Sequence, residues 1–276
     1  MNFRQNPTVL ATLLLVFLVQ CRGYSYRLLQ GWNRYEVDCC YVEAEEGISL
    51  DQVTSELQWK WPEIQIIHDR FFPDVDSKPV LVLYKNQESY RAQLGDLPQN
   101  LLAHYELQRR AIHVPLDAPA SVWRHEMAHR YLHELSPSAP FWFQEGLARF
   151  IQGYSTLAGP CDRQSMEGEL QQWVLQRKTD VAIKTMELPG NVDFKDMPEA
   201  LKKSALSGVF VYFLWTRGDL QRILRYLPSN PKADPLYPIT GGERGRMEEL
   251  RQRYLDFLEN PVFQAAPAKC GADAAS

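Results

Sequence analysis

The segment SVWRHEMAHRYLHEL, residues 121–135, constrains the fold of this chain more than any other feature. It fits the pattern H-E-x-x-H with His125, Glu126 and His129. Residues four apart lie on one face of a helix, with Cβ atoms about 5–6 Å apart, so both imidazoles can reach one zinc ion at about 2.0–2.1 Å. Glu126 is turned aside from that pair, and it can therefore contact a water molecule without occupying the metal.

The alternative interpretation of this segment is a solvated helix whose histidines carry no chemistry. The context favours the metal site, because a helix over 118–135 is predicted independently by its apolar periodicity and by Asp117 as N-cap, with Pro119 in the first turn. A strand precedes the helix and an acidic candidate lies downstream. His133 extends the same stripe, but eight residues at 1.5 Å rise place it about 12 Å from His125, so it is not expected to bind the same ion.

The third ligand is expected at Glu145, in the segment FWFQEGLARF. Aromatic residues surround it, and the small residues Gly146 and Ala148 permit close helix packing. Its carboxylate would complete a set of two histidines and one glutamate and leave a fourth position for water. The alternative, a glutamate on a helix surface, is disfavoured by the hydrophobic flanks. A histidine six residues after the second is excluded as third ligand, because Leu135 stands there.

HEMAH followed by PFWFQEGLARF resembles the gluzincin zinc metallopeptidases, above all the bacterial peptidase MA-like family, over roughly residues 78–152. The resemblance implies an α+β fold with a thermolysin-like core, in which a small sheet packs on the active-site helix and a helical lobe follows. It also implies one Zn2+ ion per chain at His125, His129 and Glu145, with Glu126 as the general base. The activity implied is hydrolysis of peptide bonds in a peptide or protein substrate by a zinc-activated water.

Two departures from the family pattern leave a second function class open. Thermolysin-type enzymes place an acid four residues after the ligand glutamate, where this chain has Arg149, and carry a downstream Tyr or His for the oxyanion, where it has Ser204 and Ala205. Tyr212, expected in the core, and Tyr154 are nearby, and the sequence singles out neither. The alternative is an envelope lipoprotein that binds zinc, is catalytically weak or inactive, and serves as a binding or scaffolding module. A third hypothesis is a structural domain without metal.

Residues 1–21 predict an export signal rather than part of the fold. Arg4 precedes an apolar run over 9–19, which is shorter than the roughly 20 residues that span a bilayer. Three interpretations stay open: lipidation at Cys21, in a segment that resembles a bacterial lipoprotein box; cleavage after Gly23; and an uncleaved anchor. We therefore expect export to the bacterial cell envelope, as a periplasmic or membrane-anchored protein.

The remaining cysteines are Cys39, Cys40, Cys161 and Cys270. An oxidising compartment permits disulfides, but the sequence does not set their pairing. Neighbours on a strand point to opposite faces, so at most one of Cys39 and Cys40 is expected in the core. A bridge from one of them to Cys161 and burial as small apolar residues both stay open. Without a CxxC pair, a cysteine zinc site is not expected.

The charge balance excludes one class of partner. The chain has 30 Lys and Arg against 34 Asp and Glu, a formal net charge of −4, so it carries no basic field for nucleic acid. The expected partners are a peptide or protein substrate and, through a lipid anchor, a membrane. The sequence does not indicate an oligomeric state.

Apolar periodicity divides the chain into an α/β first half and an all-helical second half. The expected units are the leader (1–21), an α/β zinc-binding catalytic domain (22–152), a helical C-terminal lobe (153–264) and a disordered tail (265–276). Strands are expected over 34–44 and 78–84, and a hairpin over 103–116. Helices are expected over 50–71, with a capping box and with a kink or break at Pro62, and over 86–94, 118–135, 141–152, 166–178, 200–215, 218–227 and 246–259.

The segment AIHVPL, residues 111–116, is expected at the sheet edge above the cleft. In the resembled enzymes such an edge strand pairs with the substrate backbone. His113, within this arm, could contact substrate, but the favoured interpretation is an ordinary exposed or half-buried histidine. Trp123 and the aromatic run 141–143 are expected in the core rather than in a substrate pocket, because they occupy helix-packing positions.

Overall fold

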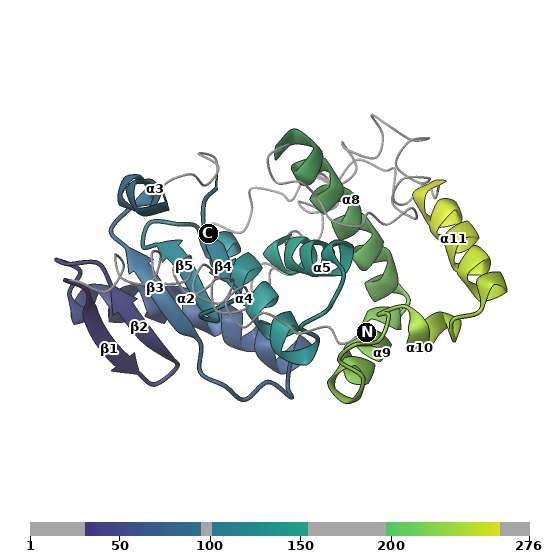
Figure 1. Ribbon diagram of the computed structural model, residues 1–276, viewed down its shortest axis with the longest axis horizontal. Helices are drawn as coiled ribbons and strands as arrows, with labels where there is room; N and C mark the ends of the chain where they lie inside the picture. The colour runs from purple at the N-terminus through teal and green to yellow at the C-terminus, as the bar shows by residue number, and fades with distance from the viewer. Residues whose placement is uncertain (1–30, 95–100, 154–196, 260–276) are drawn as a thin grey trace, which may run out of the picture.

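The computed structural model describes residues 31–94, 101–153 and 197–259, and its architecture is α+β (Figure 1). The strands are β1 (Asn33–Val37), β2 (Cys40–Ala44), β3 (Val80–Tyr84), β4 (His104–Glu106) and β5 (Ala111–Pro115). The helices are α2 (Leu50–Phe71), α3 (Gln87–Leu94), α4 (Ala120–Leu135), α5 (Phe141–Gly153), α8 (Met197–Thr216), α9 (Asp219–Tyr226), α10 (Tyr237–Thr240) and α11 (Arg244–Glu259), with a 3-10 turn, η1 (Leu227–Ser229). The leader, the predicted helix 166–178 and the predicted tail lie outside the described residues.

The five strands form one mixed sheet in the order β1-β2-β3-β5-β4. β2 and β5 run parallel to β3, whereas β1 and β4 are antiparallel edge strands. The predicted hairpin is confirmed as the pair β4 and β5. The placement of residues 111–116 at the sheet edge is wrong: β5 is buried along its whole length between β3 and β4, and β4 is the edge. The apolar run of β5 suits an interior strand, because both of its faces are covered.

The predicted single strand over 34–44 is in fact the hairpin of β1 and β2, in which Val37 pairs with Cys40. Cys40 is buried and Cys39 is half-buried. The prediction that at most one of the two lies in the core is therefore confirmed, although their Sγ atoms lie only 3.2 Å apart. Cys39 lies in the turn, where the alternation of side chains along a strand does not apply. Cys161 lies outside the described residues.

The first residues of helices α2 and α4 test the predicted N-caps. The capping box of α2 is confirmed, because the Gln52 N–H donates to Ser49 Oγ at 3.2 Å and the Ser49 N–H donates to Gln52 Oε1 at 2.9 Å. α2 continues through Pro62 as one helix. The N-cap of α4 is Pro119, with no side-chain hydrogen bond, so Asp117 as the cap is wrong. The extended backbone of Pro119, with ψ at 149°, delays the helix until the next residue.

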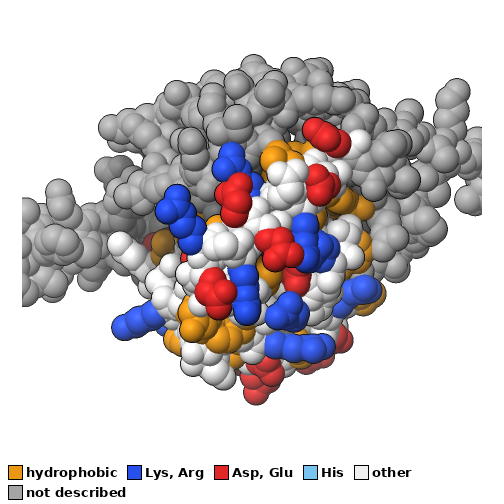
Figure 2. Space-filling model, turned by 90° about the vertical axis from the view of Figure 1, so that its right-hand side faces the viewer, with side chains coloured by type: hydrophobic (Ala, Val, Ile, Leu, Met, Phe, Trp, Pro, Cys, Tyr) orange, Lys and Arg blue, Asp and Glu red, His pale blue; other side chains and the backbone are white. Residues whose placement is uncertain are grey.

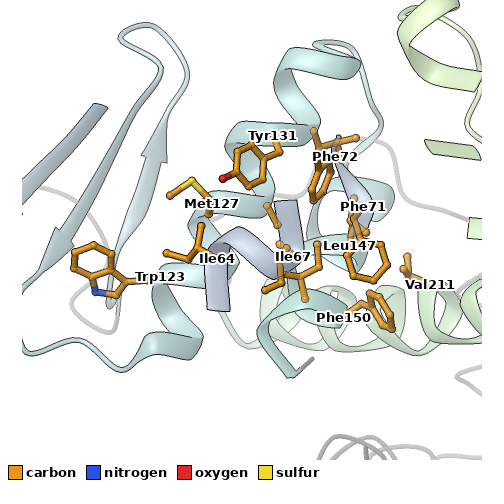
Figure 3. Packing of buried hydrophobic residues seen from close by; sticks show 14 of the residues in the cluster. Ile64, Ile67, Phe71, Phe72, Trp123, Met127, Tyr131, Leu147, Phe150 and Val211 are labelled. Atoms are coloured by element: carbon orange, nitrogen blue, oxygen red, sulfur yellow. The ribbon is translucent and has the colours of Figure 1, made fainter. Parts of the chain in front are cut away.

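Helices α4 and α5 lie between the sheet and helices α8 to α11 (Figure 1). Figure 3 shows the core that α2, α4, α5 and α8 build together. Its labelled side chains are each at most 3% exposed, and they are Ile64, Ile67, Phe71, Phe72, Trp123, Met127, Tyr131, Leu147, Phe150 and Val211. Trp142, Phe143 and Tyr212 are buried as well, so the expected core position is confirmed for Trp123, Trp142, Phe143 and Tyr212, whereas Phe141 is only half-buried. This packing places α2 and α8 around the pair of helices α4 and α5 and holds that pair together.

The surface of the helical part carries both signs of charge. Figure 2 shows Lys and Arg mixed with Asp and Glu on the face that includes α11. Arg246 pairs with Glu243 at 3.2 Å and Arg251 with Glu248 at 3.6 Å. Among the described residues, no helix has both the length and the apolar character that crossing a membrane requires.

Candidate metal centre

Helices α4 and α5 bring His125, His129 and Glu145 into one cluster. His129 Nε2 lies 3.1 Å from His125 Nε2 and 3.3 Å from Glu145 Oε1, and His125 Nε2 lies 4.0 Å from Glu145 Oε2. One ligand atom from each residue can be chosen so that all three lie within 4.8 Å of one another. The group could therefore hold a metal ion, and it is the one group of this kind found among the described residues.

The spacing of these atoms suits a small divalent cation. Bonds of about 2.0–2.1 Å at tetrahedral angles place neighbouring donor atoms about 3.3 Å apart. The separations of 3.1 and 3.3 Å match that value, and the separation of 4.0 Å between His125 Nε2 and Glu145 Oε2 is longer. Two imidazole nitrogens and a carboxylate oxygen are also a donor set that zinc accepts.

Gly146 explains how α5 can carry Glu145 to this place. A Cβ atom at Gly146 would lie 2.6 Å from the Ser207 backbone oxygen and 2.8 Å from Val211 Cγ2, closer than side chains tolerate. The absence of a side chain lets α5 lie directly on α8. The expectation that a small residue beside Glu145 permits close helix packing is therefore confirmed, and the packing partner is α8.

Burial and the charges within the cluster shift the pKa values of all three residues. Burial lowers the pKa of His125 to about 3. Burial opposes ionisation of Glu145, but the charges of His129 and His125 and the hydrogen bonds from His129 and Ser204 together outweigh it and lower the pKa of Glu145 to about 2. Burial also opposes protonation of His129, but the charge and hydrogen bond of Glu145 together with the charge of Glu126 outweigh it and raise the pKa. A proton shared by His129 and Glu145 thus occupies the position of a cation, and metal binding would release it.

Glu126 stands beside the cluster and does not join it. Its side chain is buried, and its carboxylate accepts a hydrogen bond from the backbone N–H of Tyr105 in the edge strand β4. Burial raises the pKa of Glu126 to about 7. A carboxyl group with that pKa can take up and release a proton near neutral pH. Glu126 therefore lies between the three-residue cluster and the open edge of the sheet.

Hydrogen-bond partners of the cluster come from α5 and α8. His125 Nδ1 lies 3.1 Å from Gln152 Oε1, and the Ser204 hydroxyl donates to Glu145 Oε2 at 2.9 Å. Arg149 contacts both partners, through Nη1 to Gln152 Oε1 at 3.2 Å and through Nε to Ser204 Oγ at 3.0 Å. The sequence interpretation missed Gln152. The available signal was its position seven residues after Glu145, which places both on one face of α5.

The other histidines lie apart from the cluster. His133 is half-buried with its ring against Tyr105, 5.8 Å between centroids, which agrees with the prediction that it does not join the other two. The expectation of an exposed or half-buried His113 is wrong: this residue is 1% exposed and bonds Tyr84 and Glu106. Tyr154 lies outside the described residues.

The donor atoms and their spacing describe a site that could hold one divalent cation, with the buried carboxyl group of Glu126 beside it. The chain matches no model of a known protein family and no curated protein. What the site does is therefore inferred from the chemistry of its residues.

Proposed function

We propose that this protein is a zinc-dependent metallopeptidase with a gluzincin-like, thermolysin-like core. The observation that carries the proposal is Glu126, a buried carboxyl group with a pKa of about 7 beside His125, His129 and Glu145. Structural zinc sites fill all four positions with protein ligands, whereas catalytic sites keep one open. Three donors with an adjacent base fit the second kind.

The chain's own residues supply the remaining chemistry. His125, His129 and Glu145 would hold the ion, which when bound supplies Lewis acidity to polarise the scissile carbonyl and acidify a water molecule. Glu126 would take the proton of the attacking water and deliver it to the leaving amine. The hydrogen bond from the Tyr105 N–H would help to orient the Glu126 carboxylate toward β4.

A peptide substrate is the class that the edge strand β4 favours. β4 pairs with β5 on one side and forms the edge of the sheet on the other. Tyr105 lies opposite Ile112 of β5 in this pair, and its backbone N–H bonds Glu126. An extended peptide that adds to this edge would bring its backbone next to Glu126. Export to the cell envelope would place that substrate outside the cytoplasm.

A second candidate function is an envelope lipoprotein that binds zinc without catalysis. Ser204 favours it, because this residue stands where the resembled enzymes carry a Tyr for the oxyanion, and its hydroxyl bonds Glu145 instead. Such a protein would need the three-residue cluster and would not need Glu126. Variants of Glu126 therefore separate the two candidates.

The test combines metal content with hydrolysis of a quenched-fluorescent peptide library. We expect about one zinc per chain by inductively coupled plasma mass spectrometry in the wild type and in Glu126→Gln, with hydrolysis reduced about 10²–10⁴-fold in the variant. Glu134→Gln is the matched control on α4, because Glu134 pairs with Arg130 away from the cluster. Zinc without any hydrolysis would favour the second candidate, and a wild type that takes up no zinc would contradict both.

A further inference from the structure

Arg149 makes two hydrogen bonds that lead to two different residues of the cluster. Its Nη1 donates to Gln152 Oε1 at 3.2 Å, and Gln152 Oε1 also faces His125 Nδ1 at 3.1 Å. Its Nε donates to Ser204 Oγ at 3.0 Å, and Ser204 Oγ donates to Glu145 Oε2 at 2.9 Å. A guanidinium group can only donate hydrogen bonds, so it fixes the direction of both chains.

The first chain sets the tautomer of His125. Because Arg149 donates, the atom of Gln152 that faces it must be the amide oxygen rather than the amide nitrogen. That oxygen can only accept, so His125 Nδ1 must carry the hydrogen. In a neutral imidazole the other nitrogen then has a free lone pair. His125 Nε2, the atom that faces His129 and Glu145, is thereby left ready to bind a metal.

The second chain sets the orientation of Glu145. The Ser204 hydroxyl has one hydrogen, and because its oxygen accepts from Arg149, that hydrogen is directed to Glu145 Oε2. The other carboxylate oxygen, Oε1, is left facing His129 at 3.3 Å. The carboxylate is therefore held by one oxygen and presents the other to the cluster.

We infer that Arg149 is a positioning residue for the metal site, and that it acts through Gln152 on His125 and through Ser204 on Glu145. The inference rests on the proposed function in so far as the cluster holds zinc. It also explains how a cation can stand where the resembled enzymes have an acid: the carboxyl partner of the histidine is replaced by an amide oxygen, and the arginine aligns that amide.

The surrounding structure holds this arrangement in place. A Cβ atom at Gly208 of α8 would lie 3.0 Å from Arg149 Cβ, so the glycine makes room for the arginine stem. Arg124 of α4 donates to the backbone oxygen of Gln152 at 2.8 Å and pairs with Glu63 of α2. The end of α5 is thereby tied to α4 at the level of His125.

The first experiment measures the zinc dissociation constant of the whole protein by competition with a chromogenic chelator. Loss of a hydrogen-bond partner of a metal ligand typically weakens binding about 10–100-fold, and we expect that for Gln152→Leu and Arg149→Met. Gln152→Glu keeps an acceptor for His125 and for Arg149 and should restore wild-type affinity. Gln144→Leu is the matched control on α5, because Gln144 bonds the backbone of Ala139 instead. Equal affinity in Gln152→Leu and Gln144→Leu would overturn the inference.

The second experiment does not depend on metal. Two-bond ¹H–¹⁵N correlation spectra of the zinc-free protein should assign the Nδ1–H tautomer to His125 in the wild type and in Gln152→Glu, and a mixture of tautomers in Arg149→Met. An Nε2–H tautomer in the wild type would overturn the inference even if zinc binds. A wild type that takes up no zinc but shows the Nδ1–H tautomer would contradict the proposed function and leave the role of Arg149 in orienting His125 supported.

Discussion

Two pairs of histidines in the described residues differ in what their ring nitrogens contact. The helix pair, His125 and His129, stands on α4 with rings at 77° to each other and 4.8 Å between centroids. The strand pair, His104 and His113, is stacked across β4 and β5 with rings at 17° and 4.4 Å between centroids. Both pairs contain buried or half-buried imidazoles next to a glutamate. Neither the number of histidines nor their burial therefore distinguishes the helix pair from the strand pair.

The strand pair is satisfied by hydrogen bonds from other side chains. His113 Nε2 lies 2.9 Å from Glu106 Oε2, and its Nδ1 lies 2.8 Å from the Tyr84 hydroxyl. Since the carboxylate accepts from Nε2–H, Nδ1 accepts from the tyrosine, and a neutral imidazole meets both demands. His104 Nδ1 has the Tyr90 hydroxyl as partner at 3.0 Å. These side-chain hydrogen bonds tie the edge strand β4 to its neighbours and leave no ring nitrogen of His113 in need of an ion.

The helix pair lacks such a balance at its centre. Nε2 of His125 and Nε2 of His129 face each other and the Glu145 carboxylate, so either a proton or a metal ion must lie between these three groups. The comparison teaches that what the ring nitrogens face separates a metal site from a structural cluster. Identical substitutions at the two pairs test this distinction.

The largest difference is expected between His129→Ala and His113→Ala. Loss of a hydrogen-bond partner of a ligand weakens zinc affinity roughly 10–100-fold. In His129→Ala a ligand itself is removed, so we expect the zinc affinity to fall by more than that. The second should keep wild-type zinc affinity but lose about 1–3 kcal/mol of stability for each partner left unsatisfied, Tyr84 and Glu106. Chelator competition and denaturant unfolding of the zinc-free proteins measure the two effects. Zinc loss in His113→Ala would remove the distinction.

Local spacing was enough to predict the helix pair. The four-residue separation on one helix, the capping box of α2, the apolar helices α5 and α8 and the amphipathic helix α11 all depend on neighbours within about two turns. Glu145 could be singled out for the same reason, from its flanks. Whether the chain hydrolyses peptides stays a prediction.

Contacts between distant residues could not be predicted in this way. His113 meets Tyr84, which is 29 positions away, only because β5 lies next to β3 rather than at the sheet edge. Ser204 was noted as a departure from a family pattern, but its bond to Glu145 across 59 positions depends on the close approach of α5 and α8. The turn at Cys39 was missed because it lacks the glycine or asparagine that usually signals a hairpin.

Gly146→Ala should have the next largest effect. Gly146 lies next to Glu145 on α5, so this variant should disturb the helix pair and leave the strand pair unchanged. The added Cβ would meet the Ser207 backbone oxygen at 2.6 Å, so α5 and α8 must move apart. We expect a loss of about 1–3 kcal/mol, as in overpacked cores, together with weaker zinc binding because Glu145 moves away from Ser204. Gly245→Ala on α11, where nothing lies within 4 Å, is the control and should be neutral or stabilising. Unchanged zinc affinity in Gly146→Ala would contradict the link between this packing and the site.

Acid should weaken the strand pair whether or not zinc is bound. Burial, with His113 nearby, lowers the pKa of His104 from 6.5 to about 3. Between those values the unfolded chain binds the proton and the folded chain does not, so this stability is present above pH 6.5 and is lost as the pH falls toward 3. The slope from one group is at most about 1.4 kcal/mol per pH unit. His104→Gln, which faces the same His113, Tyr90 and Glu106, should show a shallower curve in unfolding titrations. Equal slopes would contradict this.

The smallest effect is expected for Tyr84→Phe. This variant tests whether the strand pair and the helix pair are independent of each other. The variant loses one hydrogen bond to His113 Nδ1, and we expect a loss of about 1 kcal/mol in denaturant unfolding, with unchanged zinc affinity. β4 nevertheless touches both sites, because its neighbouring residue Tyr105 donates its N–H to Glu126 while Glu106 bonds His113. A slower hydrolysis rate at wild-type zinc affinity would mean that the strand pair positions the general base through β4. An unchanged rate would confine its role to the stability of the sheet.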